Sequence, residues 1–178
     1  MFINQQFTKI NKVSEILSVE DLGVFFSLDQ GTLKAVDGVN YTLEAGKTIG
    51  IIGESGSGKS VSAQAIMRIV PKPGKITKGR ILLIQTQQEM MNLYKMTSLP
   101  LPGKDLTIDL ASINPHGDLI RAIRGKVISM IFQEPMTSLS PVHTVGNQIM
   151  EAIILHRPSE KKQAREITLD MLDRVQIS

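Results

Sequence analysis

The chain has 178 residues, 42% hydrophobic and 21% charged, with a formal net charge of +3, which predicts a single soluble domain with a substantial core. No apolar run approaches the roughly 20 residues that a membrane helix needs, and the scattered basic residues argue against a nucleic-acid partner. The absence of cysteine excludes disulfides and thiolate metal sites, and the three histidines lack the spacing of metal ligands.

The N-terminal part of the chain is expected to be mainly β-structure. Residues 16–26 carry β-branched and aromatic side chains and predict a strand, followed by a turn at residues 29–31. The pair Asp37-Gly38 is typical of a tight turn, so we expect an antiparallel hairpin around it. Residues 48–52 (TIGII) form a short continuous apolar run, which is typical of a strand buried on both faces of a parallel sheet.

The middle of the chain is expected to alternate between helix and strand. A helix should run from about residue 59 to residue 70, because Ala63, Ile66, Met67 and Val70 fall on one face and Pro71 ends it. Strands are expected at residues 79–84 and 127–132, with one or two helical turns at residues 118–124. Residues 85–103 are expected to form an irregular surface loop, which is long for a compact domain.

Two helices are expected in the last part of the chain. Residues 144–156 place Val145, Ile149 and Ile153 on one face of a helix. The last helix is expected to have Ser159 as its N-cap and Glu160 in its first turn, where a negative charge is favourable.

A glycine-rich loop between the apolar run at 48–52 and the helix after it matches the pattern G-x-x-x-x-G-K-[ST]. Its glycines permit a tight turn that points consecutive amide groups at one spot, and the helix N-terminus adds about half a positive charge. Lys59 would add a full charge at the β- and γ-phosphates, and the Ser60 hydroxyl would be a ligand of Mg²⁺. The loop therefore predicts binding of a nucleoside triphosphate as Mg-ATP. The residues expected to contact the nucleotide are Gly53, Glu54, Ser55, Gly56, Ser57, Gly58, Lys59, Ser60 and Val61.

Two further segments resemble one family of phosphate-loop proteins. Residues 127–141 (VISMIFQEPMTSLSP) look like the Q-loop region of ABC-transporter ATPases, and residues 145–149 extend the likeness to the subgroup that powers oligopeptide, dipeptide and nickel importers. Residues 35–39 (AVDGV) and 53–68 (GESGSGKSVSAQAIMR) are similar to that subgroup as well. The resemblance implies an α/β fold with a P-loop NTPase core of the ABC ATPase type. This core has a parallel sheet, which should contain residues 48–52 and 127–132, plus an N-terminal antiparallel β-subdomain.

The resemblance also implies roles for single residues. Gln133 would be the Q-loop glutamine, which touches Mg²⁺ and the attacking water, so it joins Lys59 as a catalytic residue and Ser60 as a metal ligand. Phe26 would stack on adenine, with Phe25 as the alternative, although an aromatic residue in a strand is commonly part of the core. Residues 134–141 would receive a coupling helix from membrane-spanning permease subunits.

The sequence departs from the family pattern in its second half. It has no LSGGQ-type signature, no apolar strand ending in Asp-Glu (the Walker B motif) and no switch histidine. We therefore expect the N-terminal part of one nucleotide-binding domain, with the C-terminal half of the domain missing. Its expected parts are 16–84 as β-subdomain and phosphate loop, 85–103 as an inserted loop, 104–156 as the Q-loop region and 157–178 as the start of a helical subdomain.

The function implied by the resemblance is that of an ATPase subunit that couples ATP binding and hydrolysis to import of peptides or related solutes. This chain is expected to bind ATP without hydrolysing it, because the Walker B general base is lacking. The implied partners are the permease subunits, a second ATP-binding subunit and, indirectly, a solute-binding protein, at the cytoplasmic face of the cell membrane. An ABC-type ATPase of DNA repair or chromosome maintenance remains an alternative, as does a non-catalytic nucleotide-binding module.

Overall fold

The computed structural model describes residues 15–100, 106–133, 139–156 and 160–177. Contacts within the chain divide it into two compact units, Met1–Ile120 and Arg121–Ser178, and each unit is described by itself.

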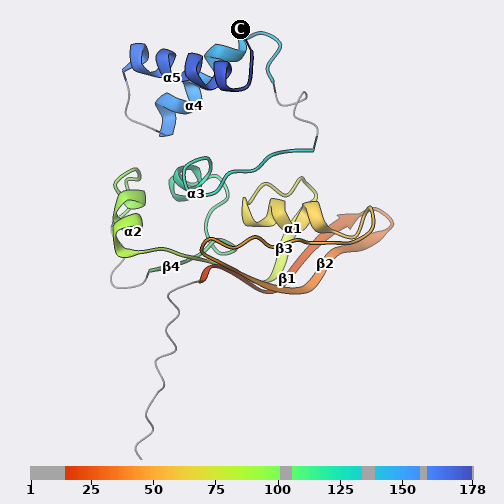
Figure 1. Cartoon of the computed structure of the whole chain (residues 1–178). Helices are drawn as coiled ribbons and strands as arrows, with labels where there is room; N and C mark the ends of the chain where they lie inside the picture. The colour runs from red at the N-terminus through yellow and green to blue at the C-terminus, as the bar shows by residue number, and fades with distance from the viewer. Residues whose placement is uncertain (1–14, 101–105, 134–138, 157–159, 178) are drawn as a thin grey trace, which may run out of the picture. The chain divides into compact units, whose positions relative to one another are not determined.

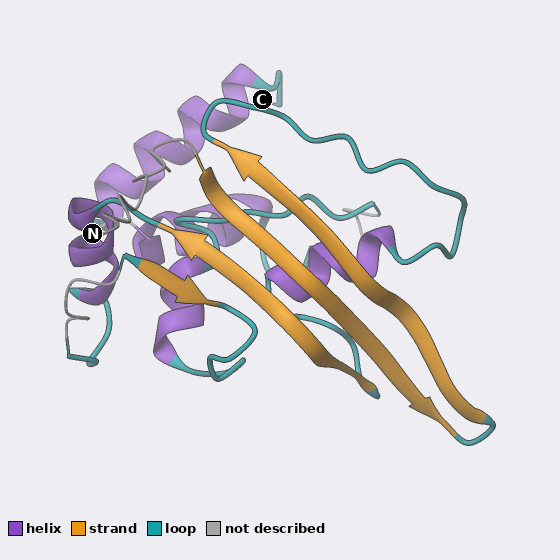
Figure 2. Ribbon diagram, turned by 90° about the horizontal axis from the view of Figure 1, so that it is seen from below, coloured by secondary structure: helices purple, strands orange, loops and turns teal. Residues whose placement is uncertain are grey.

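The first unit is built on a four-stranded antiparallel sheet with the strand order β2-β1-β3-β4 (Figure 2). Strand β1 pairs with β2 on one side and with β3 on the other, and the buried side chains of Leu22, Val24 and Ile81 form the centre of its core. The predicted antiparallel β-subdomain is therefore present. The strands are β1 (Glu15–Leu28), β2 (Gly31–Glu44), β3 (Gly74–Ile84) and β4 (Thr107–Asp109).

The hairpin between β1 and β2 turns at residues 29–30, so the hairpin predicted around Asp37-Gly38 is wrong. Strand β2 continues through this pair, and Asp37 is opposite Gly23 of β1, next to an irregularity in the register. Gly38 has a φ of +77°, and the carboxylate of Asp37 is held by the ammonium group of Lys78 at 3.0 Å. An Asp-Gly pair suits a bulge within a strand as well as a turn, and only the pairing partner decides between them.

Helix α1 (Lys59–Ile66) lies on the sheet and contacts β1 and β2 (Figure 1). It ends four residues earlier than predicted, because Arg68 takes the left-handed conformation with a φ of +55°. The face that it buries is also different from the predicted one. Ser62 and Ala65 are buried within the helix, and of the predicted apolar face only Met67 is buried. Small side chains on this face let the helix approach the strands closely.

Helix α2 (Gln87–Tyr94) lies within the stretch that was expected to be irregular, so that expectation is wrong for these residues. The helix begins with a capping box, in which the amide of Glu89 donates to the Thr86 hydroxyl at 3.3 Å and the amide of Thr86 donates to the Glu89 carboxylate at 2.8 Å. The hydroxyl of Thr86, and then its amide, lower the pKa of Glu89. Met90 and Leu93 are buried, so the helix adds to the core. The capping box is visible in the sequence as the pattern T-x-x-E, which runs from Thr86 to Glu89.

The two apolar runs predicted as parallel strands, 48–52 and 127–132, are not strands in the structure. Within the described residues, no backbone hydrogen bond joins 48–52 or 129–132 to another segment. Their apolar side chains are correspondingly open to solvent: Ile52 is 98% exposed and Ile131 is 94% exposed. A strand of this kind needs a hydrogen-bonded neighbour, and the described sheet is antiparallel throughout.

The remaining helices are α3 (Asp118–Ile123), α4 (Val145–His156) and α5 (Lys161–Arg174). Helices α4 and α5 pack on each other in the second unit and bury Ile153, Ala164 and Thr168. Their bounds lie close to the predicted ones. The N-cap of α5 is Glu160, so the prediction of Ser159 as N-cap with Glu160 in the first turn is wrong, and Ser159 itself lies outside the described residues. No helix in the described ranges is both long enough and apolar enough to cross a bilayer.

Candidate functional site

The glycine-rich loop in the first unit folds around the ammonium group of Lys59. The Nζ atom of Lys59 donates hydrogen bonds to the carbonyl oxygens of Gly53 at 2.6 Å and Glu54 at 2.5 Å, and to the Ser57 hydroxyl at 3.2 Å. The Ser57 amide also donates to the Glu54 carbonyl at 3.3 Å, which closes a turn within the loop. Three of the predicted residues, Gly53, Glu54 and Ser57, thus surround the positive charge of a fourth, Lys59.

The N-terminus of α1 faces the loop without a neutralising group. Its N-cap is Gly58, which supplies no side-chain cap, and its first turn has no acidic residue. The first helical hydrogen bond runs from the Ser62 amide to the Gly58 carbonyl at 2.8 Å, so the amide groups of residues 59–61 come before it. These amides and the helix dipole favour an anion at this end of the helix.

Two of the loop glycines have close neighbours, and at one of them, Gly58, the neighbour is backbone. A Cβ atom on Gly58 would collide with the carbonyl oxygen of Ala35 on β2 and lie 3.3 Å from Cγ2 of Val36, and Gly58 itself has a φ of +89°. A Cβ atom on Gly53 would lie 2.7 Å from the Ser57 hydroxyl. Strand β2 therefore fixes the position of the loop, and only glycine fits at the point of contact.

Phe26 lies on β1, which pairs with β2, the strand that contacts the loop. It is opposite Leu33 of β2 and Gly74 of β3, and its half-buried ring lies against Gly74, where an added Cβ would be 2.6 Å from the ring. The ring of Phe25 instead has the ammonium group of Lys34 at 5.3 Å from its centroid. Stacking of adenine on Phe26 remains a prediction.

The other predicted residues are accessible. Glu54, Ser55, Gly56 and Ser60 are exposed, so the Ser60 hydroxyl is free to meet a metal ion. No group of three or more His, Asp or Glu side chains able to hold a metal occurs among the residues that the structure describes.

Gln133 belongs to the second unit and is exposed. Residues 134–138 of the predicted partner segment lie outside the described residues, while 139–141 are described. The metal and catalytic roles of Gln133 therefore remain predictions.

The contacts that shape the loop could not be identified from the sequence. Lys59 binds backbone carbonyls, and Gly58 packs against the backbone of Ala35. Every residue carries a carbonyl group, so no pattern of side chains marks these positions.

The gathered residues fit the phosphates of a nucleotide with Mg²⁺. One short loop contains an ammonium group, an uncapped helix N-terminus, a glycine (Gly58) without room for a side chain and an exposed serine hydroxyl. This is the donor set that a phosphate-binding loop needs.

Comparison with known proteins places these features in a family. Residues 36–178 match the family model described as ABC transporter. The chain is 38% identical over 167 residues to the oligopeptide transport ATP-binding protein OppD of Bacillus subtilis (strain 168), covering 93% of this chain and 40% of OppD. It is 41% identical over 166 residues to the dipeptide transport ATP-binding protein DppD of the same strain, covering 93% of this chain and 42% of DppD. It is also 37% identical over 163 residues to the glutathione import ATP-binding protein GsiA of Escherichia coli (strain K12), covering 91% of this chain and 23% of GsiA.

A solved structure shows the same fold. It is the dimeric post-hydrolysis state of the ATP-binding cassette MJ0796 bound to ADP and Pi, which matches with a TM-score of 0.62 at 18% identity and covers 89% of this chain and 56% of that chain. The predicted fold class is thereby confirmed, and the chain spans about two fifths of the length of OppD and DppD. This chain belongs to the ABC transporter family.

Proposed function

We propose that this chain is the nucleotide-binding part of an ATPase subunit that couples ATP binding and hydrolysis to the import of peptides or related solutes. The observation that carries the proposal is the loop around Lys59 at the uncapped N-terminus of α1. The names of OppD, DppD and GsiA, which are ATP-binding proteins of peptide and glutathione transport, support the class of solute.

The loop would bind the phosphates through its own donors. The amides of residues 59–61 point an array of N–H groups at the anion, and Lys59 exchanges its bonds to the Gly53 and Glu54 carbonyls for bonds to phosphate oxygens. These bonds are stronger because both partners are charged. Ser60 and Gln133 would hold Mg²⁺, which supplies positive charge to the phosphates when bound. Phe26 would stack on the adenine, and Gln133 would orient the attacking water.

The proposed partners follow from the same family membership. Residues 134–141 would receive a coupling helix of a permease subunit, at the cytoplasmic face of the membrane. A second ATP-binding subunit would complete the site, and a solute-binding protein would deliver the solute to the permease. In this proposal residues 16–84 form the β-subdomain and phosphate loop, 104–156 form the Q-loop region, and 157–178 begin a helical subdomain.

Calorimetry on the 178-residue chain tests the proposal. Lys59→Ala should weaken the binding of Mg-ATP by at least about 10- to 100-fold, because it removes charged hydrogen bonds to phosphate. Lys47→Ala is the matched control, since Lys47 is exposed and precedes the loop. Equal affinity of the parent and Lys59→Ala chains for Mg-ATP would overturn the phosphate-loop assignment, and with it the proposed function.

A further inference from the structure

The ring of Phe26 fills a space that exists only because Gly74 has no side chain. The two residues are paired across strands β1 and β3. A Cβ atom on Gly74 would lie 2.6 Å from Cε1 and 2.7 Å from Cζ of Phe26, and 2.8 Å from Cγ1 of Val70. Real Cβ atoms essentially never come within 3.0 Å of a non-bonded heavy atom. The edge of the ring therefore occupies the place that a side chain at this position would need.

The backbone at Gly74 does not itself require glycine. Among the residues that the structure describes, Gly74 is not one of those with a positive φ, so other residues could adopt its conformation. Its amide donates to the Pro71 carbonyl at 2.9 Å, which closes the turn between α1 and β3. A substitution at Gly74 would therefore act through its contacts with Phe26 and Val70, and not through backbone strain.

Contacts at both ends of one segment place the ring relative to the phosphate loop. Gly58 at the start of this segment packs against Ala35 of β2, and Gly74 at its end packs against Phe26 of β1. Helix α1 lies between the two contacts and rests on the same pair of strands. The loop and the ring are therefore positioned by one helix and two paired strands, all within the first unit.

Phe26 also keeps part of its ring open to solvent. It is half-buried, whereas Val24, two residues earlier on the same strand, is completely buried. A ring that stacks on a base needs a fixed plane and a surface that the base can reach, because stacking is favourable only over a narrow range of offset and separation. The contact with Gly74 provides the first requirement, and the exposed part of the ring provides the second.

We propose that Gly74 is a positioning residue for the adenine, because its missing side chain sets the place of the Phe26 ring. The inference rests on the proposed function, in which Phe26 stacks on the adenine of Mg-ATP. Gly74 does not touch the nucleotide in this scheme and acts only through Phe26. Ordinary van der Waals contact begins at 3.4 Å, so a Cβ at 2.6 Å would displace the ring by about 1 Å. A gap of that size forfeits about a quarter to a half of the dispersion energy of a contact.

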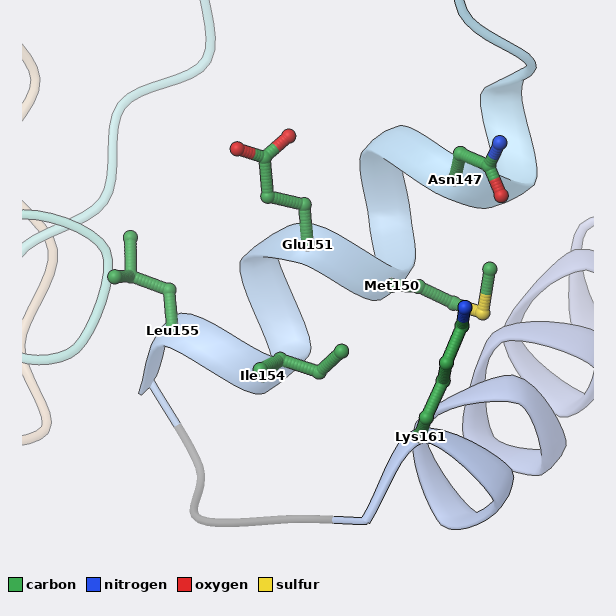
Figure 3. A pocket seen from close by; sticks show the side chains of 6 residues that line it. All are labelled: Asn147, Met150, Glu151, Ile154, Leu155 and Lys161. Atoms are coloured by element: carbon green, nitrogen blue, oxygen red, sulfur yellow. The ribbon is translucent and has the colours of Figure 1, made fainter.

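An apolar pocket in the second unit is the competing place for the base. It is open, has a volume of about 440 Å³ and lies along α4 and the start of α5 (Figure 3). Its lining residues are Asn147, Met150, Glu151, Ile154, Leu155 and Lys161. None of these residues is aromatic, so the pocket offers no ring for stacking. Ile154→Ala tests this alternative, because it removes part of the apolar lining.

Calorimetry with two ligands tests the role of Gly74 in the 178-residue chain. Mg-ATP carries the base, whereas Mg-tripolyphosphate presents phosphates alone, so the ratio of the two affinities measures the contribution of the base. Gly74→Ala should lower this ratio about two- to fivefold and leave the affinity for Mg-tripolyphosphate unchanged. Gly50→Ala is the matched control, since Gly50 has no positive φ and no described atom within 4 Å of an added Cβ.

A double-variant cycle shows whether Gly74 acts through the ring. Once Phe26→Ala has removed the ring, the addition of Gly74→Ala should change the ratio no further. A glycine that only stabilised the fold would weaken the binding of both ligands, with or without the ring. If Gly74→Ala alone does not fold, the comparison is made between Val70→Ala and Val70→Ala/Gly74→Ala, in which one of the two crowding side chains is smaller.

The inference and the proposed function fail in different ways. An unchanged ratio in Gly74→Ala, or a fall of the same size in the Phe26→Ala background, would overturn the role of Gly74. A fall in Ile154→Ala but not in Gly74→Ala would overturn it as well and would place the base in the pocket of the second unit. In each of these results the parent chain still binds both ligands through Lys59. Equal affinity of the parent and Lys59→Ala chains for both ligands would instead overturn the proposed function, and the inference with it.

Discussion

The hydroxyl of Tyr41 on β2 lies 3.3 Å from the hydroxyl of Ser62 on α1. Ser62 is buried and is part of the face that α1 turns toward β1 and β2. Because the side chains on this face are small, they add little packing of their own. The hydrogen bond is therefore a directional contact between the sheet and the helix that begins with Lys59. The position of the phosphate loop therefore depends on the sheet through a contact far from the loop in sequence.

Tyr41→Phe should lower the free energy of unfolding by about 1 kcal/mol, because it leaves the buried Ser62 hydroxyl without this partner. Tyr94→Phe is a matched control, since no hydrogen bond of the Tyr94 hydroxyl occurs in the described portion of the chain. Urea unfolding followed by circular dichroism measures both. Equal losses in the two variants would show that the Tyr41 hydroxyl contributes nothing specific.

Gly58→Ala should abolish binding of Mg-ATP and destabilise the chain by more than its left-handed backbone alone explains. The left-handed conformation costs a non-glycine residue about 1–2 kcal/mol, and the new Cβ would also collide with the Ala35 carbonyl. Gly46→Ala has a comparable φ of +69° but nothing within 4 Å, so it isolates the backbone cost. Calorimetry and urea unfolding of both variants make the comparison. Intact binding in Gly58→Ala would mean that the contact with β2 does not position the loop.

Phe26→Ala should weaken binding of Mg-ATP by about two- to tenfold, which is the range expected for losing one aromatic stacking contact. Phe25→Ala should have a smaller effect on affinity, because the Phe25 ring is engaged with Lys34. The measurement is a titration of each folded variant with Mg-ATP, and Phe26→Tyr should bind as the parent does. If Phe25→Ala lost more affinity than Phe26→Ala, the assignment of the stacking residue would be reversed.

Stability should depend on pH through a cluster of charges on the sheet. Lys78 donates to Asp21 at 3.1 Å and Asp37 at 3.0 Å. Lys78 first, and then Lys34, hold the pKa of Asp37 below its usual value, and Asp37 in turn raises the pKa of Lys78.

A carboxyl group with a lowered pKa stabilises the fold above its unfolded pKa of about 3.9 and stops doing so as the pH falls through its folded pKa. A lysine with a raised pKa contributes fully below about pH 10.4 and loses its contribution only above that. The difference in stability between the parent and Lys78→Met should therefore be present at pH 7, decrease as the pH falls below about 3.9, and shrink in high salt, because the groups are exposed.

Urea midpoints at pH 7 and pH 3 measure this difference, with Lys75→Met on the same strand as control. A difference that persists unchanged at pH 3 would point to packing of the Lys78 side chain as its source.

Local signals in the sequence determined the phosphate loop and the two last helices. The loop is predicted by a short run of glycines followed by lysine and serine, although the bonds that shape it, such as Lys59 to the Gly53 carbonyl, involve backbone atoms and are seen only in the structure. Helices α4 and α5 follow from periodic apolar positions, because a helix satisfies its backbone within its own segment. The capping box of α2 was equally local, and the prediction overlooked it.

Tertiary structure decided everything that depends on a neighbour distant in sequence. Asp37-Gly38 became a bulge because β2 continues beside β1, and residues 48–52 formed no strand because no described segment pairs with them. Tertiary structure likewise decided the close approach of Gly58 to Ala35 and the hydrogen bonds between the Gln148 side chain and the Ser140 backbone. Both contacts involve backbone atoms, which carry no sequence signature. A strand, a bulge and a docked loop each exist only when their partner is in place, because their hydrogen bonds and contacts lie outside the segment itself.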